Sequence, residues 1–140
     1  MRTSGKQLVV DANVILRYLV HDDDALYAKA AAVFKAIEAG RVSVLCDPVI
    51  LAEVVWVLAS YYKISRDEIA EDLESLLEAD GFTIPNKDRY VRALRLYAGS
   101  VPHFGDACAC AAAIEDCGGK LLSFDRKLSA VKGISRLESV

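Results

Sequence analysis

The chain alternates short apolar runs with longer segments in which apolar residues recur at helical spacing. Leu8-Val9-Val10 is an apolar run that ends in Asp11, and a segment with helical periodicity begins at Asn13. This order predicts a buried parallel strand, about 7–10, that leads into a helix, with Asp11 at the carboxyl end of the strand. In open α/β sheets, functional sites are built at that edge.

The same alternation continues along the 140 residues. It predicts strands over about 41–46, 82–84, 120–124 and 134–137, and helices over about 13–20, 25–39, 49–62, 66–79, 87–98 and 107–117. Strands that alternate with helices predict a three-layer α/β/α fold around a central, mostly parallel sheet of four to five strands. We expect the two strands 7–10 and 120–124 to be the middle strands of that sheet. The length fits a single domain, residues 1–140.

The segment 49–62 is apolar on nearly every side, which predicts a buried helix rather than an amphipathic one. Glu53 is its only carboxylate. A buried carboxylate has to be paired with a cation, protonated or bound to a metal, because an isolated charge is strongly disfavoured in an apolar environment. Glu53 is therefore a candidate site residue.

Two further carboxylates occupy comparable positions, Asp106 just before helix 107–117 and Asp125 just after strand 120–124. Taken singly, each has a simpler interpretation, because Asp11 or Asp106 can cap a helix and Asp125 can hold a turn. Four carboxylates at one sheet edge would repel one another unless a cation neutralised them. Oxygen ligands without His or Cys indicate Mg²⁺ or Mn²⁺, which can activate water and stabilise a phosphoryl transition state.

Composition and charge narrow the function classes. The net charge of −3 is uneven: residues 1–80 carry 8 basic and 14 acidic side chains, which gives −6, and residues 81–140 carry 9 and 6, which gives +3. This balance is unlike that of a protein that coats nucleic acid. The hydrophobic fraction of 54% is high for a small monomer and indicates either apolar surface buried in a partner or a helix-rich core.

The cysteines do not form a recognisable disulfide or zinc pattern. None of Cys46, Cys108, Cys110 and Cys117 belongs to a C-x-x-C pair, so we interpret them as small buried hydrophobic residues. The N-terminal residues are not followed by a signal-peptide hydrophobic region, and no apolar run approaches the length of a membrane span. These features predict a cytoplasmic protein.

Four segments, taken in order, resemble the motifs of PIN-domain ribonucleases, and most of all those of the VapC-like toxins of type II toxin–antitoxin systems. They are Asp11-Ala12-Asn13-Val14-Ile15-Leu16, Leu51-Ala52-Glu53-Val54-Val55-Trp56-Val57-Leu58, Phe104-Gly105-Asp106-Ala107 and Ser123-Phe124-Asp125-Arg126-Lys127-Leu128. The resemblance covers nearly the whole chain. It implies a PIN domain that hydrolyses RNA as a Mg²⁺- or Mn²⁺-dependent endoribonuclease.

The resemblance also implies residue roles. Asp11, Glu53 and Asp106 would bind the metal, and Asp125 would complete the site directly or through water. Asn13 and Ser123 would orient the ligand carboxylates without binding the metal themselves. Family members often carry one more carboxylate just before the position of Asp106, where this chain has His103, whose role is open. The implied partners are an RNA substrate, a cognate antitoxin that blocks the site, and a second copy of the chain.

Alternative functions differ in specific residues. A phosphatase of the haloacid-dehalogenase type needs an Asp two positions after Asp11, where this chain has Asn13. A receiver domain needs an acidic pair before the first helix, which is absent. A PIN-domain RNA-processing nuclease without an antitoxin and a non-catalytic PIN-fold binding module both remain open, although the presence of all four carboxylates argues against the second.

Overall fold

The computed structural model describes residues 6–140. Strands and helices alternate through most of the chain, which confirms the predicted order of elements to within a few residues at each boundary. The elements are β1 (Lys6–Val9), α1 (Ala12–Leu19), α2 (Asp24–Glu38), β2 (Val42–Leu45), α3 (Pro48–Ser60), α4 (Arg66–Glu78), β3 (Phe82–Thr83), α5 (Lys87–Ala98), α6 (Phe104–Asp116), β4 (Lys120–Leu122), the 3₁₀ turn η1 (Arg126–Ala130) and β5 (Ser135–Leu137).

Strands β1, β2 and β3 form a parallel sheet with β2 in the centre. Leu8 pairs with Val44, which in turn pairs with Phe82. Each crossover between these strands contains helices, as parallel strands require. The predicted α/β class with a parallel sheet is therefore confirmed, and the helix and strand mix is consistent with a PIN-like α/β/α fold.

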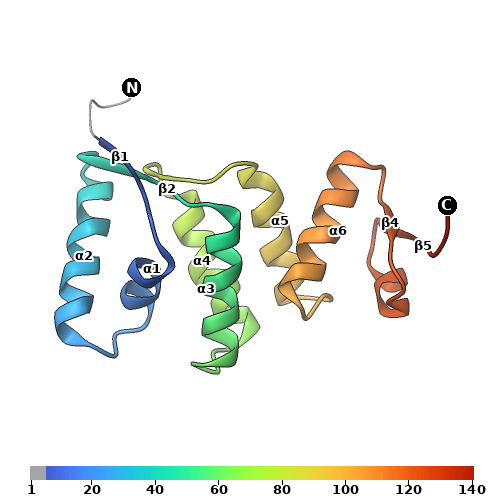
Figure 1. The fold of residues 1–140 in the computed structure, drawn as a ribbon, viewed down its shortest axis with the longest axis horizontal. Helices are drawn as coiled ribbons and strands as arrows, with labels where there is room; N and C mark the ends of the chain where they lie inside the picture. Colours follow the sequence, from blue (N-terminus) through green and yellow to red (C-terminus); the bar gives the residue numbers. More distant parts are fainter. Residues whose placement is uncertain (1–5) are drawn as a thin grey trace.

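The prediction of one central sheet of four to five strands, with 7–10 and 120–124 as its middle strands, is wrong. Within residues 6–140, the first sheet has three strands with β1 at its edge, and β4 pairs only with β5 in a separate parallel sheet. Figure 1 shows the two sheets at opposite ends of the molecule, with α5 and α6 between them. The sequence could not reveal that the strands lie in separate sheets, because the apolar character of a strand is the same whichever strand pairs with it.

A tight turn after α6 directs β4 away from the first sheet. Gly118 and Gly119 both have positive φ, of 60° and 83°, a conformation that favours glycine. A Cβ on Gly119 would lie 2.0 Å from the carbonyl oxygen of Gly133, so only glycine allows this backbone approach. The turn leaves β4 beside α6, where Ser135 donates its N–H to the Gly119 carbonyl at 2.8 Å and begins the pairing with β5.

The core fills the space between the helices and the first sheet. Ile15 of α1 and Leu94 of α5 have no exposed surface, and Leu73 of α4 and Phe82 of β3 are almost fully buried. No polar or charged residue is buried among the described residues. The helices are thus held by apolar packing, which follows from their periodicity.

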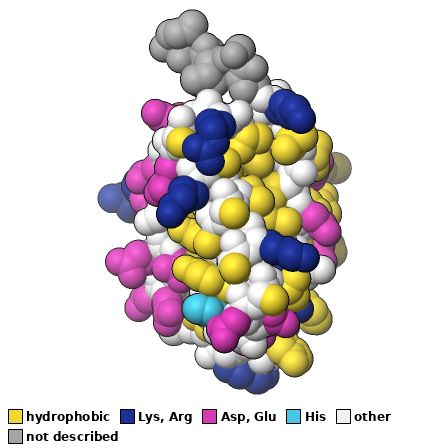
Figure 2. All heavy atoms as spheres, turned by 90° about the vertical axis from the view of Figure 1, so that its left-hand side faces the viewer, with side chains coloured by type: hydrophobic (Ala, Val, Ile, Leu, Met, Phe, Trp, Pro, Cys, Tyr) yellow, Lys and Arg dark blue, Asp and Glu magenta, His cyan; other side chains and the backbone are white. Residues whose placement is uncertain are grey.

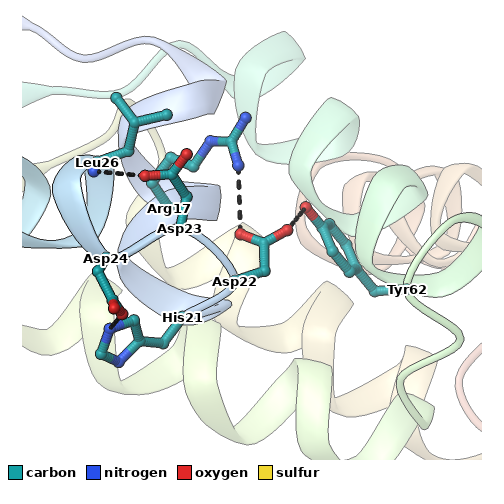
Figure 3. A network of polar contacts seen from close by, with 7 residues as sticks. All are labelled: Arg17, His21, Asp22, Asp23, Asp24, Leu26 and Tyr62. Carbon is teal, nitrogen blue, oxygen red and sulfur yellow. Dashed lines mark hydrogen bonds and ion pairs between the residues drawn. The ribbon is translucent and has the colours of Figure 1, made fainter.

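Figure 3 shows how polar contacts fix the connection between α1 and α2. Asp22 accepts hydrogen bonds from Arg17 at 3.2 Å and from the Tyr62 hydroxyl at 2.9 Å, so it ties this connection to the end of α3. These contacts lower the pKa of Asp22, mainly through the Tyr62 hydroxyl, and the same bond raises the pKa of Tyr62. Asp23 then caps α2 by accepting the Leu26 N–H at 3.0 Å.

The first strand is not buried as predicted. Leu8 is 51% exposed and Val9 is 74% exposed, because only one edge of β1 has a neighbouring strand among residues 6–140. Val10, just after β1, is the first residue of this run to enter the core.

The cysteines follow the prediction only in part. All four are free thiols; Cys46 and Cys110 are buried, Cys108 is half-buried, and Cys117 is exposed in the turn after α6. Burial raises the pKa of Cys46 and of Cys108 to about 11, so both stay protonated at neutral pH. None of the helices in the described part of the chain has the length and apolarity to cross a membrane.

Candidate functional site

Asp11 lies where β1 meets α1. Its side chain is exposed and accepts the N–H of Ala12 at 2.8 Å. Asp11 therefore caps α1, which was the simpler of the two roles considered for this residue. The second carboxylate oxygen remains available for another ligand. The capping role and a metal-binding role are therefore compatible.

Glu53 is not buried, contrary to the sequence prediction. Helix α3 has one exposed face, formed by Val49, Ala52, Glu53 and Trp56, and only its opposite face packs in the core. The apolar residues on the exposed face concealed it in the sequence, since periodicity identifies a solvent face only when that face is polar. The argument that burial forces Glu53 to bind a cation therefore fails, and its candidacy depends on its position.

Asp106 and Asp125 also lie near the starts of helical segments. Helix α6 begins at Phe104, earlier than predicted, so the half-exposed Asp106 lies in its first turn and His103 is the capping residue. Asp125 begins η1 by accepting the N–H of Lys127 at 3.0 Å. The hydroxyl of Ser123 accepts the backbone N–H of Asp125 at 3.0 Å, which fixes the position of this carboxylate.

The chemistry of these side chains suits a divalent cation, but their arrangement within one chain does not. Hard carboxylate oxygens are the ligands that Mg²⁺ and Mn²⁺ prefer. Across residues 6–140, however, no three His, Cys, Asp or Glu side chains lie close enough together to hold a metal ion. Asp125 follows β4, in the second sheet, whereas Asp11 follows β1, in the first. A single chain in this conformation does not fit the metal.

Sequence reasoning missed a cleft of about 570 Å³ beside Glu53. It lies between the exposed face of α3 and the start of α6, and it includes Trp56, which is 68% exposed, and His103. The spacing alone could have placed an aromatic side chain beside this candidate carboxylate, because Trp56 is three residues from Glu53 and shares its helix face.

A second hollow lies between α1 and α2 on the face seen in Figure 2. Its volume is about 290 Å³, and the predicted orienting residue Asn13 lies at its rim with Arg17 and Lys29. Val14 and Leu26 are among the apolar residues that line it. Figure 2 shows hydrophobic side chains along this face with both basic and acidic groups beside them. We call this hollow the α1–α2 groove.

Comparison with known proteins identifies the fold family. The PIN domain model matches residues 8–134, which include all four candidate carboxylates. None of the curated proteins matches the chain significantly. The matched segment spans nine-tenths of the sequence and contains the β1–α1 junction, the exposed face of α3 and the starts of α6 and η1. The chain therefore belongs to the PIN domain family.

Proposed function

We propose that this protein is a Mg²⁺- or Mn²⁺-dependent endoribonuclease. PIN domains are generally nucleases and commonly metal-dependent, so the family match supports a hydrolase. The observation that carries the proposal is the match over residues 8–134 together with the presence of Asp11, Glu53, Asp106 and Asp125 in the segments of this sequence that resemble PIN-domain motifs. Because all four are exposed or half-exposed, each is accessible to a cation and to a substrate.

Asp11, Glu53, Asp106 and Asp125 would hold the cation, although within one chain their arrangement does not form its site. A cation held by these residues would supply an activated water and charge stabilisation at the phosphodiester. Ser123 would keep Asp125 in place through the backbone hydrogen bond described above. We retain Asn13 as a proposed orienting residue, since it follows Asp11 by two positions on the first turn of α1.

We further propose that the nuclease is the toxin of a toxin–antitoxin pair. The α1–α2 groove supports this role, because it combines an apolar floor with Arg17 and Lys29 at its rim. A peptide with apolar side chains and acidic residues would complement both features. A PIN nuclease that processes RNA without an antitoxin is the alternative, and a small DNA-binding protein encoded next to this chain would favour the toxin.

The test is incubation of the purified protein, free of any antitoxin, with total RNA and Mg²⁺ or Mn²⁺, followed by mapping of the cut ends. We expect discrete cleavage that stops when a chelator is added and that Glu53→Gln abolishes. Glu78→Gln is a matched control, since Glu78 is the last residue of α4 and is outside the PIN-like motifs. Absence of metal-dependent cleavage by the parent would favour the non-catalytic binding module.

A further inference from the structure

The cleft between α3 and the start of α6, which we call the α3–α6 cleft, has a fixed aromatic floor. Tyr97 and Phe104 line it, both are buried, and their rings meet edge to face with centroids 5.7 Å apart. Arg66 holds Tyr97 in place, because it donates to the Tyr97 carbonyl at 2.8 Å and its guanidinium lies 5.9 Å from the centre of the ring. The floor is therefore formed before any ligand arrives.

Trp56 stands beside this floor with most of its surface open to solvent. It is 68% exposed, although tryptophan is among the largest apolar side chains. Glu53 precedes it by one helical turn on the same face of α3, so their Cβ atoms are about 5–6 Å apart. An exposed indole ring next to a candidate catalytic carboxylate offers a surface on which another flat ring can stack.

A glycine keeps the side of the cleft formed by α6 open. Gly105 lies in the first turn of this helix and lines the cleft. Glycine is less favourable than alanine in a helix, yet neither conformation nor crowding requires it here. Its φ is not positive, and a Cβ on Gly105 would meet no atom within 4 Å. The missing side chain therefore leaves space in the cleft and does not relieve a clash.

The charges of the cleft favour a neutral flat group over an anion. Among the described residues that line it, Glu53 is the only acidic one, and none is a lysine or an arginine. A phosphate or an acidic peptide would be repelled by Glu53 without a compensating cation. A nucleobase is uncharged and flat, and its edge carries donors and acceptors. The His103 ring, which does not cap α6, can pair with such an edge.

We propose that Trp56 stacks on one base of a single-stranded RNA substrate in the α3–α6 cleft and so holds the adjacent phosphodiester near Glu53. The inference rests on the proposed nuclease function and adds to it the form of the substrate. A base can enter the cleft only when it is unpaired and unstacked, as in loops, bulges and ends of RNA. One ribose joins a base to its phosphate, a span comparable to that between Trp56 and Glu53.

A second copy of the chain fits the same cleft less well. A two-fold symmetric contact uses the same patch on both chains. It would therefore bring Glu53 and Asp106, which directly follows Gly105, toward the same residues of the other copy. Burying like charges together is unfavourable, and the described lining residues supply no lysine or arginine to offset it. A nucleobase brings no charge into the cleft.

Tryptophan fluorescence tests the stacking without reference to activity. Trp56 is the only tryptophan of the chain, so the emission reports on this cleft alone. The probe is a short oligoadenylate, added in chelator so that metal-dependent cleavage does not occur. We expect saturable quenching by the oligoadenylate and none by an abasic ribose-phosphate chain of the same length. Equal quenching by the abasic chain would overturn the proposal. So would emission that changes when the protein is concentrated without RNA, because a second copy would then cover Trp56.

The anisotropy of a labelled oligoadenylate measures how much the indole ring contributes. Trp56→Ala should weaken binding by about five- to 150-fold, because stacking contributes about 1–3 kcal/mol per base, and Trp56→Phe should recover part of the loss. Tyr61→Ala is a matched control, since Tyr61 is 74% exposed at the end of α3 and lies outside the cleft. Parental affinity in Trp56→Ala, or equal losses in Trp56→Ala and Tyr61→Ala, would contradict the proposal.

Filling the cleft tests the same site by a second route. The side chain introduced by Gly105→Leu would occupy the open space, so this variant should also bind the oligoadenylate more weakly. Its melting midpoint should equal or exceed that of the parent, because leucine favours a helix and meets no clash at its Cβ. Parental RNA affinity in a folded Gly105→Leu variant would show that the base binds elsewhere.

Cleavage in Mn²⁺ separates this inference from the proposed function. Trp56→Ala should raise KM by about the factor by which it weakens binding, with little change in kcat at saturating RNA. Trp56→Phe should restore part of the KM. Base-dependent quenching by a parent that cleaves no RNA would refute the nuclease and leave the base-binding cleft standing. A parental KM in the Trp56→Ala variant of an active parent would refute the stacking role and leave the nuclease standing.

Discussion

Replacement of Asp11 by asparagine separates the structural role of this residue from its proposed catalytic role. The Asp11 side chain accepts the Ala12 N–H at 2.8 Å, and an asparagine carbonyl can accept the same bond. We expect the free energy of unfolding of Asp11→Asn to stay within about 0.5 kcal/mol of the parent, because asparagine and aspartate are comparable N-cap residues.

The catalytic role should not survive the same change. An amide is a poor replacement for a carboxylate around a hard dication. If the cation supplies the nucleophile and the charge stabilisation, its loss should slow cleavage by roughly a thousandfold or more, which corresponds to about 4 kcal/mol in the barrier. Asp11→Ala should be equally inactive and should also lose the cap, at about 0.5–2 kcal/mol of stability.

Asp47 provides a matched control. It follows β2 as Asp11 follows β1, it is exposed, and it caps α3 by accepting the Val49 N–H at 2.8 Å. Asp47→Asn should therefore keep both its stability and its cleavage rate. The assay is the initial rate of cleavage of a labelled RNA in Mn²⁺, with urea unfolding of the same preparations. Near-parental cleavage by Asp11→Asn would refute its catalytic assignment. Equal losses in the Asp11→Asn and Asp47→Asn variants would show that helix capping, not metal binding, explains the effect.

Three further predictions concern stability. Mn²⁺ should raise the melting midpoint above that in chelator, by the equivalent of about 2.7 kcal/mol at a hundred times its Kd, and identical midpoints up to millimolar metal would contradict the metal role. The Tyr62 hydroxyl lowers the pKa of Asp22, so the stability that this hydrogen bond contributes is present above the ordinary Asp value of 3.8 and is lost as the pH falls. The difference in unfolding free energy between parent and Tyr62→Phe, measured in urea, should therefore shrink in acid. A constant difference down to pH 2 would refute this. Leu94 is fully buried, so Leu94→Ala should cost about 2–5 kcal/mol in urea unfolding, and a loss below about 1 kcal/mol would show that the core collapses around the site.

Local features of the sequence determined the elements and the family. Helix α4 begins after Ser65, whose hydroxyl accepts the Glu68 N–H at 3.2 Å, and a serine followed three residues later by a glutamate is a local helix-start signal. Helix α3 begins at Pro48, where proline is favoured. These signals act within one helical turn, so they are visible without tertiary structure. The PIN-like motifs are also short segments, and the family match to residues 8–134 confirms that family.

The tertiary structure alone decided which surfaces are exposed and which strands are neighbours. Glu53 was predicted to be buried because Val49 and Trp56 are apolar, yet this face of α3 is open. Strands β1 and β4 were predicted to be the middle strands of one sheet, yet they lie in separate sheets. Both outcomes depend on contacts between segments far apart in the chain, and an apolar residue is equally compatible with a core, an interface or an open edge. Hydrophobic pattern fixes the period of an element, whereas its neighbours are fixed by packing across the whole molecule.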